Sequence, residues 1–266
     1  MDRHESQLIR TLFDEQIRRR VENDEDTEVT ATPHFVQRAA LDDVGWSEIS
    51  WTDLDTNNAR RIIAERVEYF KDIGRKFAWR VFNDDHPKNL GTLLEDAGLT
   101  LAGSAELMIA RVSEVDRRAE LPQGTSLVNV NDVTGIDHFI NVHEVVFGHD
   151  HSQLRTSLLR QLGSVPPRNE LVIAMAEGLP VSSARVEFLA SCDFASLWGG
   201  STLFEWRGRG LYRAMVAYRA SAAERRGYTY LSVTASSQSR GILEYLNFSP
   251  CGTVSTYDWK PATTSR

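Results

Sequence analysis

The sequence lacks the features that mark membrane-spanning, secreted and nucleic-acid-coating proteins. No stretch of its 266 residues approaches the ~20 consecutive apolar residues of a membrane-spanning helix, and its charged first residues include no apolar core of a secretion signal. Its two cysteines, Cys192 and Cys251, give neither a disulfide framework nor a metal-ligand spacing. With 30 Lys and Arg against 37 Asp and Glu, it also lacks the basic excess that neutralises nucleic-acid phosphates. We therefore expect a cytoplasmic chain with no membrane or nucleic-acid partner.

The composition is that of an ordinary globular protein, with 41% hydrophobic and 25% charged residues. Its length suits one large domain or two of about 100–150 residues. In the first part, apolar spacing predicts helices over 5–21, 56–74 and 87–97, and strands over 30–41, 48–54, 77–82 and 105–112. Thr56 is the expected N-cap of the second helix. The acidic run at 22–28 indicates a loop. The run Arg18-Arg19-Arg20 beside it is expected to be a solvated face, with a phosphate grip as the alternative.

A polar stretch with a proline and a glycine, at 116–124, predicts a linker between two domains, 1–115 and 125–266. After it the pattern starts again. It predicts helices over 132–147, 152–162, 211–226 and 239–246, and strands over 126–130, 170–176, 180–189, 194–198, 230–235 and 253–259. Mixed strands and helices of this kind indicate an α/β (or α+β) protein, with a mixed central sheet flanked by helices.

The two halves look related. In the first, a helix ends at Gly74, the strand FAWRVF follows, and then the helix LLEDAGL. In the second, a helix ends at Gly227, the strand YLSVTA follows, and then the helix ILEYLNF. We therefore expect a duplicated fold.

The segment between Thr202 and Tyr212, TLFEWRGRGLY, carries the clearest chemical signal. It follows a strand and opens a helix. Two glycines in such a turn let successive backbone N–H groups point into one concavity at a helix N-terminus, which suits a pyrophosphate. Cationic support would come from Arg207, Arg209 and Arg213.

The run Arg207-Gly208-Arg209-Gly210-Leu211 resembles the acetyl-coenzyme A loop of the GNAT N-acetyltransferases, whose pattern is Arg/Gln-x-x-Gly-x-Gly/Ala after a strand. The order of predicted elements from Ser126 to Trp259 also matches that fold. The resemblance implies that the loop amides bind the coenzyme pyrophosphate and that the end of the preceding strand pairs with the pantetheine arm. The implied cofactor-binding residues are Gly200, Ser201, Thr202, Arg207, Gly208, Arg209, Gly210, Leu211, Tyr212, Arg213 and Ser236.

The sequence departs from the family pattern at several positions. Tyr212 stands where the family has Gly or Ala, which would narrow the room beside the phosphates, and Phe204 replaces a proline that usually precedes the loop. Ser236 replaces an asparagine that often contacts the coenzyme. The position of the tyrosine that often protonates the departing thiolate holds Leu243, and Tyr245 lies about 200° further round the helix.

Acyl transfer to an amine needs a group that takes the amine's proton. Glu187 and Asp193 are the candidate catalytic carboxylates, each with the alternative of being an ordinary surface acid. His143 and Glu144 are candidate acceptor contacts, because in the family the first helices border the acceptor groove. The histidines near them lack the spacing of a metal site, so we expect no metal.

In the first half, the place of the loop holds Asp53 and Asp55, which would repel a pyrophosphate. The resemblance therefore implies a degenerate GNAT-like domain ahead of a catalytic one. The expected activity is transfer of an acetyl group from acetyl-coenzyme A to a primary amine of a small molecule or peptide, by direct transfer, in a monomer or homodimer. The alternative is a non-catalytic acyl-coenzyme A sensor or regulatory module.

Overall fold

The computed structural model describes residues 3–22 and 26–261, so the centre of the acidic run lies outside the described residues. The chain divides into two compact units: unit 1 holds residues 1–107 and 251–266, and unit 2 holds 108–250. Across the described ranges, no helix combines the length and apolar character needed to span a bilayer.

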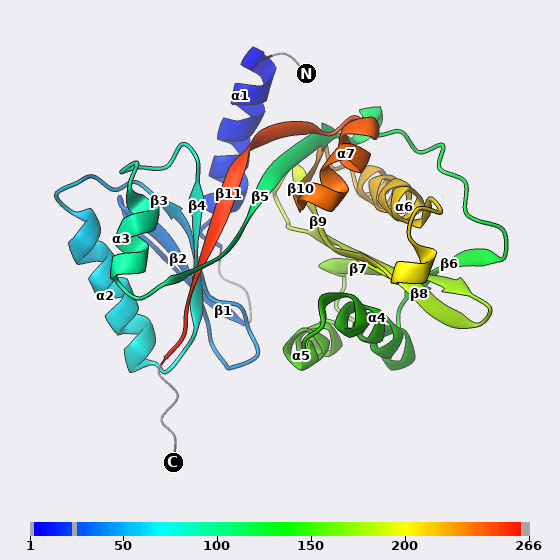
Figure 1. The fold of residues 1–266 in the computed structure, drawn as a ribbon, viewed down its shortest axis with the longest axis horizontal. Coiled ribbons are helices and arrows are strands. Elements are labelled where there is room, and N and C mark those ends of the chain that lie inside the picture. Colours follow the sequence, from blue (N-terminus) through cyan, green and yellow to red (C-terminus); the bar gives the residue numbers. More distant parts are fainter. Residues whose placement is uncertain (1–2, 23–25, 262–266) are drawn as a thin grey trace. The chain divides into compact units, whose positions relative to one another are not determined.

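Unit 1 is a mixed sheet with helices packed against it (Figure 1). Its strand order is β1-β2-β3-β4-β11-β5, and β3 and β4 run parallel. Its core joins the helices α2 and α3 to the sheet, with Phe70 stacked on Phe77 at 4.2 Å. The elements are α1 (Arg3–Phe13), a π-helical turn (Asp14–Arg18), β1 (Thr27–Ala31), β2 (Phe35–Ala40), β3 (Glu48–Thr52), α2 (Ala59–Asp72), β4 (Phe77–Phe82), α3 (Leu90–Asp96), β5 (Thr100–Arg111) and β11 (Ser249–Trp259).

In unit 2 the strand order is β5-β10-β9-β8-β7-β6, and helices lie on both faces of these strands. It begins with the end of β5 and a 3₁₀ turn at Val112–Glu114. Its further elements are β6 (Thr125–Val130), α4 (Val133–Phe147), α5 (Ser152–Arg160), β7 (Asn169–Ala176), β8 (Leu179–Phe188), β9 (Phe194–Thr202), a 3₁₀ turn (Phe204–Trp206), α6 (Leu211–Arg225), β10 (Tyr230–Ala235) and α7 (Ser237–Tyr245).

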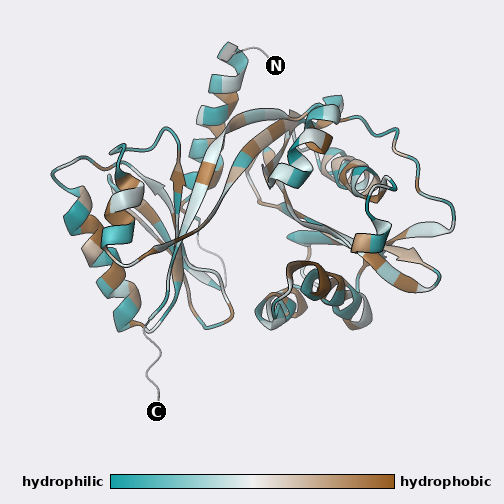
Figure 2. Ribbon diagram, in the orientation of Figure 1, coloured by the Kyte–Doolittle hydropathy of each residue, from teal (hydrophilic) through white to brown (hydrophobic). Residues whose placement is uncertain are grey.

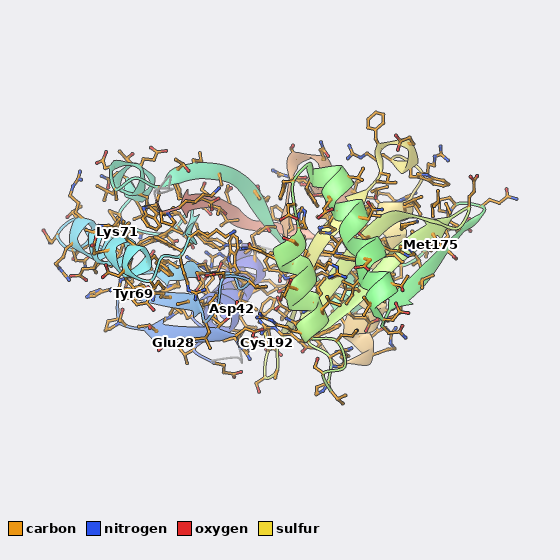
Figure 3. All side chains as sticks on the ribbon, turned by 90° about the horizontal axis from the view of Figure 1, so that it is seen from below. Glu28, Asp42, Tyr69, Lys71, Met175 and Cys192 are labelled. Atoms are coloured by element: carbon orange, nitrogen blue, oxygen red, sulfur yellow. The ribbon has the colours of Figure 1, made fainter. Side chains whose placement is uncertain are left out.

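The helices of unit 2 cover opposite faces of its sheet. Figure 3 looks onto the face where α4 and α5 lie in front of the strands, and Met175 of β7 packs there with the α4 and α5 core. The other face carries α6 and α7, whose alanines and Leu243 pack on β8, β9 and β10. The apolar residues that make these contacts, brown in Figure 2, recur along α4 and α6. The sheet therefore lies between two apolar layers, which is why β7 to β10 contain runs of buried residues, whereas the edge strand β6 is more exposed.

The last strand of each half pairs with a strand from the other half. β5 follows α3 in the chain but lies next to β10, and β11 follows α7 but lies next to β4. Trp259 of β11 is opposite Phe77 of β4. The division between the units therefore falls at residue 107/108 and again near 250, rather than in the predicted linker at 116–124. Pairing between strands so far apart in the chain cannot be recognised from the residues around either strand.

Three predicted elements have different bounds for local reasons. The strand expected over 30–41 is interrupted by a turn, where the Thr32 hydroxyl accepts from the amides of His34 and Phe35. The helix expected to start after Thr56 has Asn58 as its N-cap, so the Thr56 prediction is wrong. The strand expected over 194–198 continues to residue 202.

Candidate functional site

The candidate site lies where the strands β9 and β10 of unit 2 separate. The two strands are parallel and in register only over 194–196, opposite 230–232. β9 continues to Thr202, still paired on its other side with β8, where Ser182 lies opposite Thr202. In the pairing described for these strands, the edge of β9 facing β10 therefore has unpaired backbone groups beyond Ser196. Such an edge can hydrogen-bond an extended ligand that contains amides.

A bulge lies in this open part of β9. The register with β8 shifts there, so that Gly199 and Gly200 together face one residue of β8. Gly199 has a φ of 58°, in the left-handed region that favours glycine. Because a bulge takes residues out of the regular ladder, amides at this point can donate to an oxygen that is not part of the sheet.

The loop after β9 exposes the first amides of helix α6. Gly208 and Gly210 have φ values of 72° and 90°, which direct the chain into the helix. The first bond of the helical pattern that follows runs from the Ala214 amide to the Gly210 carbonyl, at 3.1 Å. The amides between these points have no carbonyl one turn earlier to bind, and they point out of the helix N-terminus. This is a phosphate-binding geometry.

Three arginines surround this loop in different ways. Arg207 donates through Nε to the Thr202 carbonyl at 3.1 Å and so ties the loop to β9. The Arg209 guanidinium stacks on a tryptophan ring 4.6 Å away, and that of Arg213 lies 5.7 Å from the Tyr245 ring. Stacking leaves the N–H edges of a guanidinium available for an anion.

The other residues predicted to bind a cofactor lie along the same opening. Ser201 is buried, with its hydroxyl 2.8 Å from that of Ser183. The Thr202 hydroxyl is likewise taken up by β8. Ser236 follows β10 as the N-cap of α7. Leu211 is buried in the core, so that only its backbone can meet a ligand.

Tyr212 points towards β9, although the sequence suggested that it would narrow the room beside the phosphates. A Cβ placed on Gly200 would lie 2.8 Å from Cε2 of Tyr212, so the ring fills the space that a side chain at residue 200 would need. The ring also packs against the core between α6 and the sheet.

No tyrosine takes the position of the family's proton donor. Leu243 is fully buried among apolar side chains. Tyr245 is largely exposed and lies beside Arg213, at the start of α6. Its ring therefore lies near the start of α6.

The predicted base Glu187 lies on β8. Its two carboxylate oxygens accept from Arg168 Nε at 2.9 Å and from Trp198 Nε1 at 3.0 Å. Arg185 lies two residues earlier, with its guanidinium 5.7 Å from the same tryptophan ring. Loss of solvent lowers the pKa of Arg185 below its ordinary value, while Glu187 opposes this. The carboxylate of Glu187 is thus held in one orientation among cationic and aromatic groups.

His143, predicted to contact an acceptor, is instead buried beneath the bulge, with 3% of its surface exposed. Burial lowers the pKa of His143 to about 4, and the nearby charges of His151 and Arg185 act in the same direction. The neutral ring donates through Nε2 to the Gly199 carbonyl at 2.8 Å. Its Nδ1 is buried and has no hydrogen-bond partner in the described part of the chain.

The acidic and histidine side chains near His143 have structural roles. Glu144 accepts from the amide of His151 at 3.1 Å, at the start of α5. The rings of His149 and His151 stack at 4.3 Å. Over residues 3–22 and 26–261, the structure brings together no three His, Cys, Asp or Glu side chains that could hold a metal ion.

Asp193 lies at the opposite end of β9 from the bulge. Its carbonyl accepts from the amides of Thr229 and Tyr230, which fixes the first residues of β10 beside β9. A strand rises about 3.3 Å per residue, so Asp193 is about 20 Å along the strand from the bulge. The structure does not bring this carboxylate to the opening.

Sequence reasoning missed Arg219, a fully buried residue of α6. Its Nη2 is 3.8 Å from the point where a Cβ on Gly200 would lie. The signal was present in the helical spacing, because Arg219 lies one turn after Met215 and shares its apolar face.

The equivalent opening of unit 1 is filled by the chain itself. β3 and β4 are in register only at Glu48 and Ile49. Beyond that point Arg18 donates through Nε to the Ser50 carbonyl at 3.1 Å and pairs with Asp85 at 2.6 Å. The prediction of a solvated face over residues 18–20 is therefore wrong for Arg18, because the π-helical turn places it between the strands, whereas Arg19 is exposed.

The loop before α2 carries no phosphate-binding arrangement of the kind seen before α6. Asp55 uses one carboxylate oxygen to accept from the amides of Asn57 and Asn58, at 2.7 and 2.9 Å. These amides already have an anionic partner.

No known family profile matches the sequence, and no curated protein is similar to it in sequence. Solved structures nevertheless match the fold. A GCN5-related N-acetyltransferase from Kribbella flavida has a TM-score of 0.70 at 17% identity, with 95% of each chain covered. A tandem GNAT protein from the clavulanic acid biosynthesis pathway has a TM-score of 0.60 at 14% identity, over 91% of this chain and 86% of that one. A third, from Sphaerobacter thermophilus, has a TM-score of 0.57 at 12% identity, over 86% and 81%.

These matches extend across both units, and one of the matched proteins is itself described as tandem. At such identities the likeness concerns the fold, and activity must be argued from the site. The chain has the α/β fold of the GCN5-related N-acetyltransferases, in a duplicated form.

Proposed function

We propose that the protein is an N-acetyltransferase that moves an acetyl group from acetyl-coenzyme A to a primary amine of a small molecule or peptide. The observation that carries the proposal is the opening between β9 and β10, which leads directly to the exposed amides at the start of α6. An open strand edge and a helix N-terminus in this order suit a ligand with an amide-containing arm and a pyrophosphate.

The residues fit the coenzyme along its length. The amides from Gly208 to Arg213 would hold the pyrophosphate, and Arg209 and Arg213 would neutralise its charge. The open edge of β9 as far as Thr202 would pair with the amides of the pantetheine arm. Acetyl-coenzyme A would supply an activated acyl group as a thioester.

The chain's own groups would then act around the acyl carbon. Amides of the Gly199–Gly200 bulge would donate to the acyl oxygen, in the manner of an oxyanion hole. Glu187, oriented by Arg168 and Trp198, is the proposed acceptor of the amine proton. With Leu243 buried in place of a proton donor, the departing thiolate would take its proton from water.

A second candidate function is a non-catalytic acyl-coenzyme A sensor. It is favoured by the apolar side chain of Leu243 and by the engagement of both Glu187 oxygens by neighbouring donors. The two functions differ in one measurement. An enzyme releases free thiol from acetyl-coenzyme A in the presence of a library of primary amines, and a sensor binds the coenzyme but releases none.

Coenzyme binding is tested by Gly210→Asp, with calorimetry of acetyl-coenzyme A as the measurement. The new carboxylate would lie at the helix N-terminus where the pyrophosphate is expected, so we expect affinity to fall by at least about 100-fold. The matched control is Gly227→Asp, because Gly227 has a φ of 78° and lies just past the opposite end of α6. Both changes carry similar backbone strain. Equal affinities in the two variants would contradict the assignment of the loop.

A further inference from the structure

Because the two residues of the β9 bulge are glycines, the space that their side chains would take is available to other residues. Side chains from two different helices occupy it. A Cβ placed on Gly199 would lie 2.5 Å from Cε1 of His143, on α4. A Cβ placed on Gly200 would lie 2.8 Å from Cε2 of Tyr212 and 3.8 Å from Nη2 of Arg219, both on α6. α4 and α6 cover opposite faces of the sheet. The bulge is therefore enclosed from both sides.

On the α4 face, His143 fixes the carbonyl of the bulge. Its ring stacks on Phe139, with the ring centres 4.6 Å apart, and this contact sets the direction in which Nε2 points. Nε2 donates to the Gly199 carbonyl at 2.8 Å. Because the ring occupies the space of a side chain at residue 199, only glycine lets this hydrogen bond form.

On the α6 face, Arg219 brings a buried positive charge to the bulge. Its Nε donates to the Met215 carbonyl at 3.0 Å, and its Nη1 to the Arg185 carbonyl of β8 at 3.4 Å. Its Nη2 is buried and makes no hydrogen bond of good geometry within the described ranges, and the polar side chain that supports its charge is the neutral Tyr212 rather than a carboxylate. Burial lowers the pKa of Arg219 to about 10, although the side chain of Tyr212 opposes this shift, and the guanidinium stays charged at neutral pH.

Stability alone does not account for this arrangement. A buried charge without a counter-ion costs free energy, and an apolar side chain of similar volume on α6 would avoid that cost. The charge lies beside Gly200, at the point where the proposed reaction places negative charge on an oxygen. The buried charge of Arg219 and the two glycines thus occur at one place in the sheet.

We propose that His143 and Arg219 are positioning residues that hold the Gly199–Gly200 bulge from its two faces and present its amides to the acyl oxygen. The inference rests on the proposed function. When the amine nitrogen bonds to the acyl carbon, the C=O electron pair moves onto the oxygen, where the amides and the charge of Arg219 stabilise it. The pair returns as the C–S bond breaks, the amine loses its proton, and the thiolate is protonated by water.

The test compares Arg219→Met and His143→Phe with the intact protein, using coenzyme A and acetyl-coenzyme A labelled with ¹³C at the carbonyl. Calorimetry measures the affinity for each, and NMR measures the carbonyl resonance of the bound acetyl group. We expect coenzyme A to bind all three proteins alike. The carbonyl resonance should shift on binding to the intact protein and return towards its free position in both variants.

The rate of thiol release from acetyl-coenzyme A should fall by about 100-fold in each variant, with little change in KM for the coenzyme. Arg219→Lys keeps the charge without the planar group, and we expect it to restore part of both the shift and the rate. The control is Arg225→Met, on the same helix but largely exposed, which should leave both readouts unchanged.

An unshifted carbonyl resonance in the intact protein, or variants that match it in resonance and rate, would overturn the inference while leaving coenzyme binding intact. An intact protein that binds no coenzyme A would overturn the proposed function, and the inference with it. If circular dichroism shows that Arg219→Met is unfolded, the Arg219→Lys and His143→Phe measurements decide by the same criteria.

Discussion

Tyr212 and Gly200 are explained only when they are considered together. A tyrosine at the end of the loop motif looks obstructive in the sequence, yet its ring turns inward and covers a glycine of the neighbouring strand. Gly199 and His143 form a similar pair on the other face. In each pair the large side chain fits only because the facing residue is a glycine without a side chain. This is a property of packing and cannot be recognised from either residue alone.

The titration of His143 makes stability depend on pH. Its pKa is about 4 in the folded protein and about 6.5 when unfolded, so between these values the unfolded chain binds more protons. The contribution of His143 to the free energy of unfolding is therefore complete above about pH 6.5. It is lost as the pH falls towards 4, and the total loss is about 3 kcal/mol. Urea unfolding at pH 7 and pH 4.5 measures the change.

The matched comparison is His143→Phe, which keeps an aromatic ring and removes the titrating group. Its free energy of unfolding at pH 7 is expected to be lower, because the hydrogen bond to Gly199 is lost. Between pH 7 and pH 4.5, however, it should lose less stability than the intact protein. Equal losses in the two proteins would show that other groups carry the pH dependence.

At the scale of elements, local signals located the loop and α6, and long-range contacts decided the rest. Gly208, Gly210 and the arginines lie close together in sequence, so their arrangement could be predicted. The continuation of β9 past Trp198 could not, because Gly199 and Gly200 interrupt the alternation that marks a strand. The place of Arg18 was also hidden, since its partners Ser50 and Asp85 come from distant segments.

The filled opening of unit 1 predicts a large effect of Arg18→Met. Its ion pair with Asp85 is buried, with 4% and 5% of the two side chains exposed. Burial raises the pKa of Asp85 even though Arg18 opposes the rise, so removing Arg18 would leave an unpaired buried carboxyl. We expect a loss of about 3–5 kcal/mol in the free energy of unfolding, measured with urea.

The double variant Arg18→Met with Asp85→Asn serves as the control for this prediction. It removes both charges, and we expect it to recover part of the lost stability. Two single-variant losses that simply add in the double variant would argue against a coupled pair. Affinity for coenzyme A, measured alongside, should be unchanged because the proposed site lies in unit 2.

For the stability of the whole molecule, the exchange of last strands between the halves is more important than the duplication of the halves. From β1 and from β7 onward, the two halves share a succession of three strands, a helix, a strand, a helix and a strand, with a parallel pair at β3 and β4 or at β9 and β10. Each then gives its last strand a neighbour from the other half. The halves found in the sequence therefore differ from the two compact units of the structure.

Separate halves are accordingly expected to be unstable. A fragment of residues 1–115 lacks β11, whose residues 254–259 lie opposite β4. It loses the burial of Val254 and Trp259, which we expect to cost about 5 kcal/mol together with the paired backbone groups. Thermal unfolding followed by circular dichroism should show a broad transition well below that of the intact chain.

Adding a peptide of residues 249–261 to the same fragment provides the control. It restores the partner of β4, and we expect a sharper transition at higher temperature. A fragment that unfolds as cooperatively as the intact chain without the peptide would contradict the role given to β11.

The place of β11 also determines when the protein can finish folding during its synthesis. The strand that lies beside β10 is made early, whereas the strand that lies beside β4 is made only after the other strands of unit 2. Unit 1 is translated first, yet the edge of β4 stays open until unit 2 has been made. An open apolar edge invites pairing with other chains. We therefore expect the yield of folded protein to fall when chaperones are scarce during its translation.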